Sequence, residues 1–421
     1  MNGGPATDVL VVGGGPAGLA LAIGARRAGL AATVLDRSRP PIDKPCGEGL
    51  MPDGVAALAA LGVDRARLGG RPFHGIRYLD AGAGAVTAVA EARFPAGPGL
   101  GVRRTRLHAA LAEAAAAAGA ELSWGVAARG LSLRGDRFEV VTDGGALSGR
   151  WIVAADGLAS RLRRWAGLEG RPPRRPRFGV RRHYRVAPWT SLVEVWWADG
   201  CEAYVTPVAE DEVGIAMLWN AGPVGLGKLV GLGKLGGLGK RGGLGKRGGL
   251  GKLGGLGKLG GPGKLGFDAL LARFPALADR VADAPIVSRD RGAGPLARRP
   301  RALTHRNLVL VGDAAGYLDA ITGEGLSLAF HQAAALAPAL AEGDLAGYER
   351  AHRRLARLPE ALIRLLLAVE RRPRLRRRLI RALAADPALF ARLLAIHART
   401  LPLSALGLGG ALRLAGRLAA A

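Results

Sequence analysis

One stretch near the start of the chain constrains its fold more than any other: residues 8–37, DVLVVGGGPAGLALAIGARRAGLAATVLDR. Residues 9–12 form an apolar run of strand-forming residues, and a helix rich in alanine and leucine follows after a short turn. The turn carries a G-x-G-x-x-G pattern made by Gly13, Gly15 and Gly18. A second apolar run, residues 32–35, ends at Asp36. This order of strand, turn, helix, strand and acid predicts a βαβ unit that binds a dinucleotide.

The residues of this unit have separate tasks. Gly13 permits the sharp turn, Gly15 lets the backbone approach a pyrophosphate, and Gly18 lets the helix pack on the strand. The helix N-terminus offers free N–H groups and a partial positive charge to the phosphates, while Asp36 accepts hydrogen bonds from the ribose hydroxyls. In this unit we predict nucleotide contacts for Gly13, Gly15, Pro16, Ala17, Gly18, Asp36 and Arg37.

Composition limits the class of protein and its compartment. The chain has 421 residues, enough for two or three domains with a substantial core. Cys46 and Cys201 are its only cysteines and form no paired motif, and no secretory leader is visible, so we expect a reducing cytoplasm. The uncharged residues 9–25 contain too many glycines and are too short for a membrane span. The seven histidines lack ligand spacing, so we expect no metal site.

The formal charge of +26 raises the question of nucleic-acid binding, but its distribution argues against it. Residues 225–266 are seven hexads of the form G-L-G-K-L/R-G, with no acid. Lys44 is the only lysine outside this repeat, and the abundance of arginine, alanine and glycine elsewhere is typical of a GC-rich coding sequence. We therefore expect no nucleic-acid partner. We interpret the repeat as a flexible basic surface loop, because glycine at half of its positions prevents a stable helix or core.

The loop after Asp36 resembles a known family. Residues 44–50 read K-P-C-G-E-G-L, similar to the K-x-C-G-x-G-L stretch of the geranylgeranyl reductase branch of FAD-dependent oxidoreductases, relatives of monooxygenases of the para-hydroxybenzoate hydroxylase type. In that family this loop runs beside the flavin, which implies FAD contacts for Cys46 and Gly47. For Cys46 itself we prefer an inert thiol over a redox role.

A predicted helix supplies a second point of resemblance. Residues 104–111, RTRLHAAL, resemble the R-x-x-L-D-x-x-L segment of the family, in which the arginine helps to hold the FAD phosphates. The resemblance implies this role for Arg104. His108 replaces the usual acid, Arg103 and Arg106 are alternatives in register, and a solvated Arg104 is the other interpretation.

Two further strand ends complete the resemblance. A strand predicted over residues 151–154 leads into Asp156, where the family has an aspartate behind the FAD pyrophosphate, although Asp-Gly alone signals only a turn. Residues 307–316, NLVLVGDAAG, and the glycine-flanked turn 322–325 precede a predicted helix over residues 327–340, and they form the most specific match. In the family the G-D aspartate binds the ribityl chain and the turn presses amides against the isoalloxazine. The implied FAD contacts are Asp156, Gly312, Asp313, Gly323, Glu324 and Gly325.

The middle of the chain is predicted to form a second, sheet-containing domain. Strands alternate between residues 181 and 219, for example over 191–197, 202–206 and 213–219. Alternation alone places some of its aromatic residues in a core, whereas an aromatic sheet face over a flavin would suit a flat or lipid-like substrate. Our hypothesis for residues that line the substrate pocket is Trp189, Trp196, Tyr204 and Trp219.

These patterns and the resemblance together predict an α/β fold: a Rossmann-like FAD-binding domain with an inserted mixed-sheet substrate domain and a helical C-terminal region. The FAD-binding domain is assigned to residues 1–72, 101–176 and 286–345. The substrate domain is assigned to residues 73–100 and 177–285, and the C-terminal region to residues 346–421. Because the repeat has no counterpart in the family, we expect that excising residues 225–266 leaves the FAD content intact.

The arginine-rich C-terminal region has two interpretations. Arginines alternate there with apolar residues, including Leu362, Ile363, Leu366, Leu367, Leu379, Ile380 and Leu383. These residues form either the packed side of solvated helices or a surface for peripheral attachment to anionic lipid. We expect a cytoplasmic protein, with peripheral membrane contact as the alternative, and the sequence leaves its oligomeric state open.

The resemblance also implies the chemistry. NAD(P)H acts as a transient donor to FAD, since outside the repeat no second G-x-G-x-x-G marks a nicotinamide domain. We favour a monooxygenase that hydroxylates an aromatic or polyketide-like compound, with reduction of isoprenoid or other lipid double bonds as the second hypothesis and a non-enzymatic flavin-binding adaptor as a further one. A halogenase is disfavoured, because Trp196-Trp197 does not match the W-x-W-x-I-P segment of halogenases and Lys44 lies in a different context. The chemistry is centred on the flavin, so no catalytic side chain is assigned.

Overall fold

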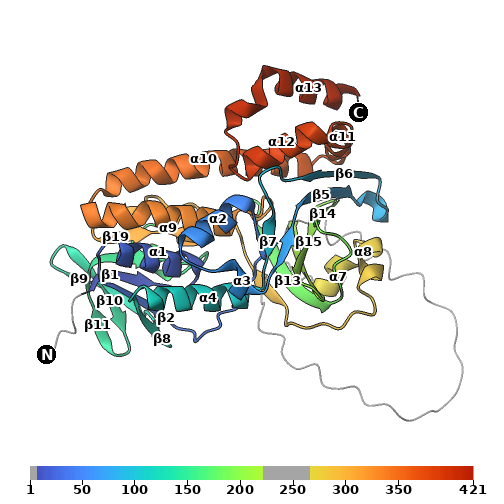
Figure 1. Cartoon of the computed structure of the whole chain (residues 1–421). Coiled ribbons are helices and arrows are strands. Elements are labelled where there is room, and N and C mark those ends of the chain that lie inside the picture. Colours follow the sequence, from blue (N-terminus) through green and yellow to red (C-terminus); the bar gives the residue numbers. More distant parts are fainter. Residues whose placement is uncertain (1–6, 221–265, 421) are drawn as a thin grey trace, which may run out of the picture.

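The computed structural model describes residues 7–220 and 266–420, which form two large sheets, two small three-stranded sheets and the helices packed around them (Figure 1). Of the repeat at residues 225–266, only Gly266 belongs to these ranges. Its interpretation as a surface loop, and the expected effect of its excision, therefore stay predictions.

The first sheet has six strands in the order β18-β19-β12-β1-β2-β8. All neighbouring pairs are parallel except β18 with β19 at one edge. The strands are β1 (Thr7–Val12), β2 (Ala32–Asp36), β8 (Glu121–Trp124), β12 (Gly149–Ala154), β18 (Thr304–His305) and β19 (Leu308–Leu310). Continuous apolar runs suit these strands because both faces of the sheet are covered. β1 lies between β12 and β2, so the glycine turn that follows β1 is flanked by the ends of both neighbours.

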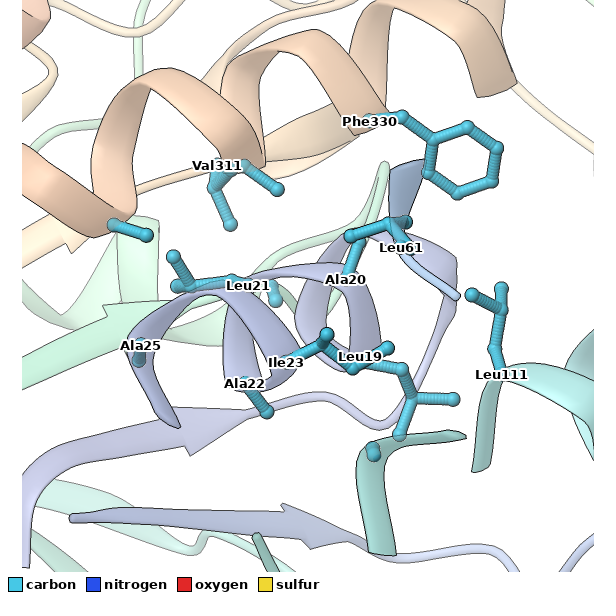
Figure 2. Packing of buried hydrophobic residues seen from close by; sticks show 14 of the residues in the cluster. Leu19, Ala20, Leu21, Ala22, Ile23, Ala25, Leu61, Leu111, Val311 and Phe330 are labelled. Atoms are coloured by element: carbon cyan, nitrogen blue, oxygen red, sulfur yellow. The ribbon is translucent and has the colours of Figure 1, made fainter. Parts of the chain in front are cut away.

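Three helices cover one face of this sheet: α1 (Pro16–Arg27), α4 (Arg104–Ala117) and α9 (Gly325–Glu342). Figure 2 shows buried side chains of α1 in one cluster with Leu111 of α4, Val311 after β19 and Phe330 of α9. The other face packs against α5 (Arg161–Trp165) and an antiparallel meander of β9 (Gly130–Arg134), β10 (Arg137–Thr142) and β11 (Gly145–Leu147). This arrangement is the predicted Rossmann-like domain.

The second sheet has seven strands in the order β17-β13-β16-β15-β14-β5-β6 and is mixed, because β14 and β5 are parallel while the other pairs are antiparallel. Its strands are β5 (Gly75–Asp80), β6 (Ala88–Arg93), β13 (Arg177–Arg185), β14 (Val193–Ala198), β15 (Cys201–Ala209), β16 (Glu212–Asn220) and β17 (Arg291–Ala293). Since β17 pairs with β13, the sheet continues beyond residue 285, where the sequence placed its boundary. The three residues of β17 are too few to show a strand periodicity.

The two faces of the second sheet have different partners. The outer face packs against α7 (Phe267–Leu271) and α8 (Pro275–Arg280). The inner face carries Glu202, Tyr204 and Thr206 of β15. Tyr204 and Thr206 are hydrogen-bonded to Ile321 and Gly47 of the first domain, and Glu202 pairs with Arg177 of β13. Between the two domains lie α2 (Pro52–Ala60), α3 (Arg65–Leu68) and a small sheet of β3 (Gly49–Leu50), β4 (Arg71–Phe73) and β7 (Gly99–Gly101).

The C-terminal region is helical, as predicted. It contains α10 (Leu345–Glu370), α11 (Pro373–Ala384), α12 (Pro387–His397) and α13 (Gly407–Ala420). α10 packs against α9, and α11 and α12 pack against β6. Ile363, Ile380 and Leu383 are buried in one cluster with Trp197 of β14, so this apolar side of the helices packs on the body of the protein. Within the described ranges, no helix has the length and apolar character needed to cross a membrane.

Candidate functional site

The turn after β1 is the first corner of the candidate site. Gly13 has φ +116°, and a Cβ atom there would lie 2.3 Å from the carbonyl oxygen of Ala155, just after β12. A Cβ atom on Gly18 would lie 2.0 Å from the carbonyl oxygen of Gly13, so α1 packs directly on the turn. Gly15 caps α1 without a side-chain hydrogen bond, and Arg104 Nη2 lies 3.8 Å from its Cβ position. An uncapped helix N-terminus beside a guanidinium group suits an anion.

Asp36 ends the neighbouring strand, and its side chain is held at the same turn. Asp36 is 9% exposed, its Oδ2 accepts a hydrogen bond from the Gly14 N–H at 2.9 Å, and its Oδ1 accepts one from the Ser38 N–H at 2.8 Å. These bonds orient the carboxylate at the position predicted for a ribose acceptor. The neighbouring Arg37 is exposed.

His108 supports this corner from α4. The buried ring donates Nε2–H to the carbonyl oxygen of Gly14 at 2.8 Å, and its Nδ1 accepts from the Ile42 N–H at 3.4 Å. Burial lowers the pKa of the imidazole, in keeping with a neutral ring that has one donor and one acceptor. Trp124 packs against it, with ring centroids 5.7 Å apart. His108 therefore shapes the glycine turn, a role that no pattern in the sequence marked.

Arg104 is the arginine that reaches the glycine turn. It is 5% exposed, its Nη1 has no hydrogen-bond partner among the described residues, and burial lowers the pKa of its guanidinium. Arg103 and Arg106, the other candidates for a phosphate contact, have different partners. Arg103 forms an ion pair with Glu212, and Arg106 donates to the carbonyl oxygen of Gly69 at 3.2 Å. Arg104 is thus not solvated. A buried guanidinium with a free N–H group beside α1 fits the pyrophosphate of a dinucleotide.

Glu48 fixes the loop of residues 44–50 between the two domains. It is buried with φ +60°, and its Oε1 accepts a hydrogen bond from the Arg104 N–H at 2.8 Å. Its Oε2 is hydrogen-bonded to Nε2 of His183, and Nη2 of Arg181 lies 3.7 Å from Oε1. Both partners come from β13 of the second sheet. The family-like loop is therefore anchored to the inserted domain as well as to α4.

Cys46 and Gly47 lie on this loop next to the anchored carboxylate. Thr206 of β15 donates its hydroxyl to the carbonyl oxygen of Gly47 at 2.9 Å. Cys46 Sγ accepts a hydrogen bond from the Glu48 N–H at 3.3 Å. Burial raises the pKa of the Cys46 thiol, which favours the protonated and weakly reactive form.

The G-D pair after β19 meets the first corner. Gly312 has φ +61°, and a Cβ atom there would lie 2.7 Å from Ala17 Cβ at the start of α1. The Gly312 N–H donates to Gln332 Oε1 at 2.8 Å, which fixes the turn on α9. Burial raises the pKa of Asp313, while the positive charges of Lys44 and Arg104 oppose this effect. Corners that are far apart in the sequence therefore face one another in the fold.

Asp156 belongs to the same junction. It directly follows Ala155, whose carbonyl oxygen adjoins Gly13. Asp156 Oδ2 accepts hydrogen bonds from the Arg161 N–H at 2.7 Å and the Leu162 N–H at 3.3 Å, so it orders the start of α5. Its Oδ1 has no hydrogen-bond partner among the described residues. The four strand ends singled out in the sequence, after β1, β2, β12 and β19, thus converge at one edge of the first sheet.

Solved structures of flavoproteins share this fold. A flavoprotein/dehydrogenase from Cytophaga hutchinsonii is 17% identical, with a TM-score of 0.75 and a match that covers 94% of both chains. A geranylgeranyl bacteriochlorophyll reductase-like protein from Thermoplasma acidophilum is 19% identical, with a TM-score of 0.63 over 97% of this chain and 95% of that one. A halogenase variant in complex with FAD is 15% identical, with a TM-score of 0.65 over 97% of this chain and 85% of that one. A search of curated proteins gave no match.

A comparison with protein families decides the assignment. Residues 6–207 match a family described as an FAD binding domain. The chain belongs to the superfamily of FAD-dependent oxidoreductases. FAD is its cofactor, and the free Nη1 of Arg104, the uncapped N-terminus of α1 and the ordered carboxylate of Asp36 fit the phosphates and ribose of this dinucleotide.

The flavoprotein holds the turn of residues 322–325 through its C-terminal region. Gly323 has φ +72°, and Gly325 is the first residue of α9. Glu324 is 4% exposed, and its Oε2 lies 3.3 Å from Nε2 of His397 at the end of α12. Burial pulls the pKa of His397 down, but the Glu324 carboxylate raises it above the usual value. Sequence reasoning missed His397, because nothing local to α12 indicates a partner on α9.

The tryptophans proposed to line the substrate pocket of the flavoprotein do not share a face with Tyr204. Trp196 and Trp219 are buried in the outer-face core with α7 and α8, and Trp189 packs against the same core. Strand alternation therefore removes Trp196 and Trp219 from the inner face, whereas Trp189 lies in the segment between β13 and β14. The Tyr204 hydroxyl is on the inner face, where it lies 3.1 Å from the carbonyl oxygen of Ile321.

The aromatic residues on the inner face of the flavoprotein are different ones. Trp197 points to the side opposite its neighbour Trp196 and lies edge-on to Tyr78, with ring centroids 6.0 Å apart. Tyr78 in turn stacks on Phe390 of α12 at 5.3 Å. The C-terminal helices thus cover this part of the sheet, and the side chains form a packed core there.

A buried ion cluster joins the two domains of the flavoprotein and α10. Arg177 of β13 lies 3.0 Å from Glu202 of β15, 3.1 Å from Asp319 and 3.9 Å from Glu370 at the end of α10. Burial raises the pKa of Asp319 to about 6. One guanidinium therefore links the second sheet, the segment after the G-D pair and the C-terminal region.

A cavity of about 510 Å³ in the flavoprotein borders the segment that follows the G-D pair. Its walls also include residues 298–303, α9 and α10. The residues that line the cavity include Tyr317, Asp319 and Thr322 after the G-D pair, Leu328 of α9, and Ala356 and Ile363 of α10. Among the described residues no group of three or more His, Cys, Asp or Glu side chains is arranged to hold a metal ion.

Proposed function

We propose that this flavoprotein is an NAD(P)H-dependent monooxygenase that hydroxylates an aromatic or polyketide-like small molecule. The observation that carries the proposal is the cavity of about 510 Å³ against residues 317–325. Its volume suits a molecule with one or a few rings. This segment includes the turn that the family resemblance puts beside the isoalloxazine. Apolar residues of α9 and α10 together with the Tyr317 ring suit a flat organic compound.

In this proposal the chain supplies binding, orientation and exclusion of water. Arg104 and the N-terminus of α1 hold the phosphates, and Asp36 accepts from the ribose. The partial positive charge at the N-terminus of α9, which begins at Gly325, stabilises negative charge on the ring system. FAD, when bound and reduced by NAD(P)H, supplies the electrons for the activation of oxygen.

Reduction of an isoprenoid or other lipid double bond is the second candidate. It is favoured by the loop of residues 44–50, whose half-buried Cys46 lies near Arg104 and Tyr317 at the candidate flavin site. This loop carries the residues that resemble the reductase branch. The apolar part of the cavity lining, which includes Leu328, Ala356 and Ile363, also suits a prenyl chain.

Oxygen dependence separates the two reactions. Purified protein is first tested for bound FAD by its absorption spectrum and then for reduction of the flavin by NADH and by NADPH without oxygen. We expect candidate aromatic compounds to stimulate oxygen uptake and to gain one oxygen atom by mass. Anaerobic turnover of a polyprenyl compound with a gain of two hydrogen atoms would support the reductase instead. Flavin that neither nicotinamide reduces would contradict both reactions and favour an adaptor.

A filled cavity tests the location of the substrate. Ala356→Trp on α10 narrows the cavity, whereas Leu365 on the same helix is 57% exposed and Leu365→Trp serves as the matched control. We expect Ala356→Trp to raise the substrate KM or to uncouple oxygen uptake while the FAD content stays normal. Unchanged kinetics in Ala356→Trp would exclude this cavity as the substrate site.

A further inference from the structure

The last part of the chain is strongly basic. After Glu370 the sequence contains eleven arginines and a single acid, Asp386. That acid caps α12, because its Oδ1 accepts a hydrogen bond from the Leu389 N–H at 2.9 Å. The surface formed by α11 to α13 therefore has a large excess of positive charge, which favours an anionic partner.

The apolar residues that the sequence suggested for lipid contact are not the exposed ones. Ile363, Ile380 and Leu383 are buried in the core beneath the inner face. Exposed leucines occur instead at the end of the described chain, at Leu403 just before α13 and at Leu408 within it. The apolar sides of α10 and α11 are therefore packed in the core, and α13 is the helix of this region with an exposed apolar side.

One face of α13 is apolar and has no partner in the structure as described. Leu408 is 86% exposed and Leu412 is 71% exposed, while Leu403 is 61% exposed in the short turn before the helix. Ala415 and Ala419 continue the spacing of four, three and four residues that keeps side chains on one face of a helix. Figure 1 shows α13 outside α11 and α12, and another side of α13 packs on α11.

Two exposed arginines lie on the polar side of α13, away from this apolar face. Arg413 and Arg417 are one helical turn apart, and α13 contains no acidic residue. A helix with leucines on one face and arginines on the other can lie in the plane of a bilayer, where the basic face is attracted to anionic headgroups. A stable protein interface needs about 20–30 residues on each side, far more than this single face provides.

We propose that α13, together with Leu403, is a docking surface for an anionic lipid bilayer. The leucines enter the boundary between headgroups and acyl chains, and Arg413 and Arg417 on the polar side of the helix attract the anionic surface electrostatically. This inference is independent of the reaction proposed above. It concerns attachment at the surface of a bilayer, since none of the described helices is suited to span one.

Flotation with vesicles tests the proposal on the FAD-loaded full chain. The vesicles contain phosphatidylcholine alone or phosphatidylcholine mixed with phosphatidylglycerol. We expect binding to the mixed vesicles only, weakened by salt. The repeat also carries seven lysines, so each protein is tested with and without residues 225–266. Loss of all vesicle binding when the repeat is deleted would assign the lipid contact to the repeat and overturn the proposal.

Two double variants separate the apolar and the basic parts of the surface. Leu408→Asn with Leu412→Asn is expected to lower the partition coefficient roughly tenfold or more, because two leucine side chains no longer enter the lipid. Arg413→Gln with Arg417→Gln is expected to remove the preference for phosphatidylglycerol. The control is Leu133→Asn, which changes a leucine that is 55% exposed in the FAD-binding domain.

FAD content and thermal unfolding show whether each variant is folded. Binding that is equal in the wild type and in both double variants would refute the proposal. So would a dimer, detected by sedimentation, that the leucine substitutions dissociate, because it would assign the apolar face to a second copy of the chain. Equal binding to neutral and anionic vesicles would refute the role of the arginines.

Discussion

Replacing Arg104 by methionine should weaken FAD binding and at the same time stabilise the flavin-free protein. The guanidinium is almost fully buried, and its Nη1 has no partner among the described residues. In the free protein it is therefore a buried charge with incomplete hydrogen bonding. Methionine fills a similar unbranched volume without the charge. The opposite signs of the two effects distinguish a cofactor-binding arginine from a structural one.

The magnitudes follow from the geometry. A phosphate charge about 4 Å from the guanidinium is stabilised by about 4 kcal/mol at an effective dielectric constant near 20. Solvation of the free phosphate offsets part of this energy, and a net loss of about 3 kcal/mol corresponds to a rise of roughly a hundredfold in the Kd for FAD. For the flavin-free protein, removal of a buried and partly unpaired donor should raise the free energy of unfolding by about 1–2 kcal/mol.

Two measurements check this prediction. Fluorescence titration of the deflavinated protein gives the Kd for FAD, and urea titration gives the free energy of unfolding. The control is Arg106→Met on the same helix, which changes an arginine bonded to Gly69 at the surface and should leave both quantities unchanged. An unaltered Kd in Arg104→Met would refute the reasoning. So would a flavin-free variant that is less stable than the wild type.

Three further predictions concern the supports of the site. Glu48→Gln should lower the free energy of unfolding by about 2 kcal/mol in urea titration, because it replaces the buried carboxylate that is hydrogen-bonded to His183 and to the Arg104 N–H, while Arg181 keeps its ion pair with Asp43; a loss below about 1 kcal/mol would contradict this. Gly14→Ala should cost about 2 kcal/mol, since its Cβ would lie 2.3 Å from the Trp124 ring, and Trp124→Leu in the same chain should recover most of this loss in urea; no recovery would disprove the contact. The pKa of His397 is raised beside Glu324. The wild type should therefore be more stable than His397→Gln below about pH 6.5, and this difference in the free energy of unfolding should disappear as the pH rises through the raised pKa of His397 in the folded protein. Thermal melts across this range should show that trend, and a difference that does not change with pH would rule out the ion pair.

Local patterns in the sequence, together with the family resemblance, were sufficient to predict the fold and the corners of the site. Gly13, Asp36 and Gly312 each stand at the end of an apolar strand, and the signals for such corners lie within a few residues of one another. Parallel strands have their carboxyl ends at one edge of a sheet, so the fold brings these separate corners together. That is why the FAD-binding domain could be predicted although its segments are far apart in the chain.

The direction of individual side chains could not be predicted in the same way. Strand alternation places Trp196 and Trp197 on opposite faces, but which face is the inner one depends on where α7, α8 and α12 pack. Likewise, the sequence left Arg103, Arg104 and Arg106 as alternatives, because only the position of α4 against the glycine turn decides which arginine reaches it. Such choices depend on tertiary contacts between distant elements, and short-range patterns do not contain them.

The position of β19 in the first sheet has a consequence for biosynthesis. The G-D corner belongs to a strand near the end of the FAD-binding domain, and it adds to the sheet beside β12. The ribosome has therefore synthesised the whole inserted domain before Asp313 leaves the exit tunnel. Until then the FAD site lacks the corner formed by Gly312 and Asp313. Fragments that stop before this strand should remain colourless, and the nascent chain acquires its flavin only late in translation.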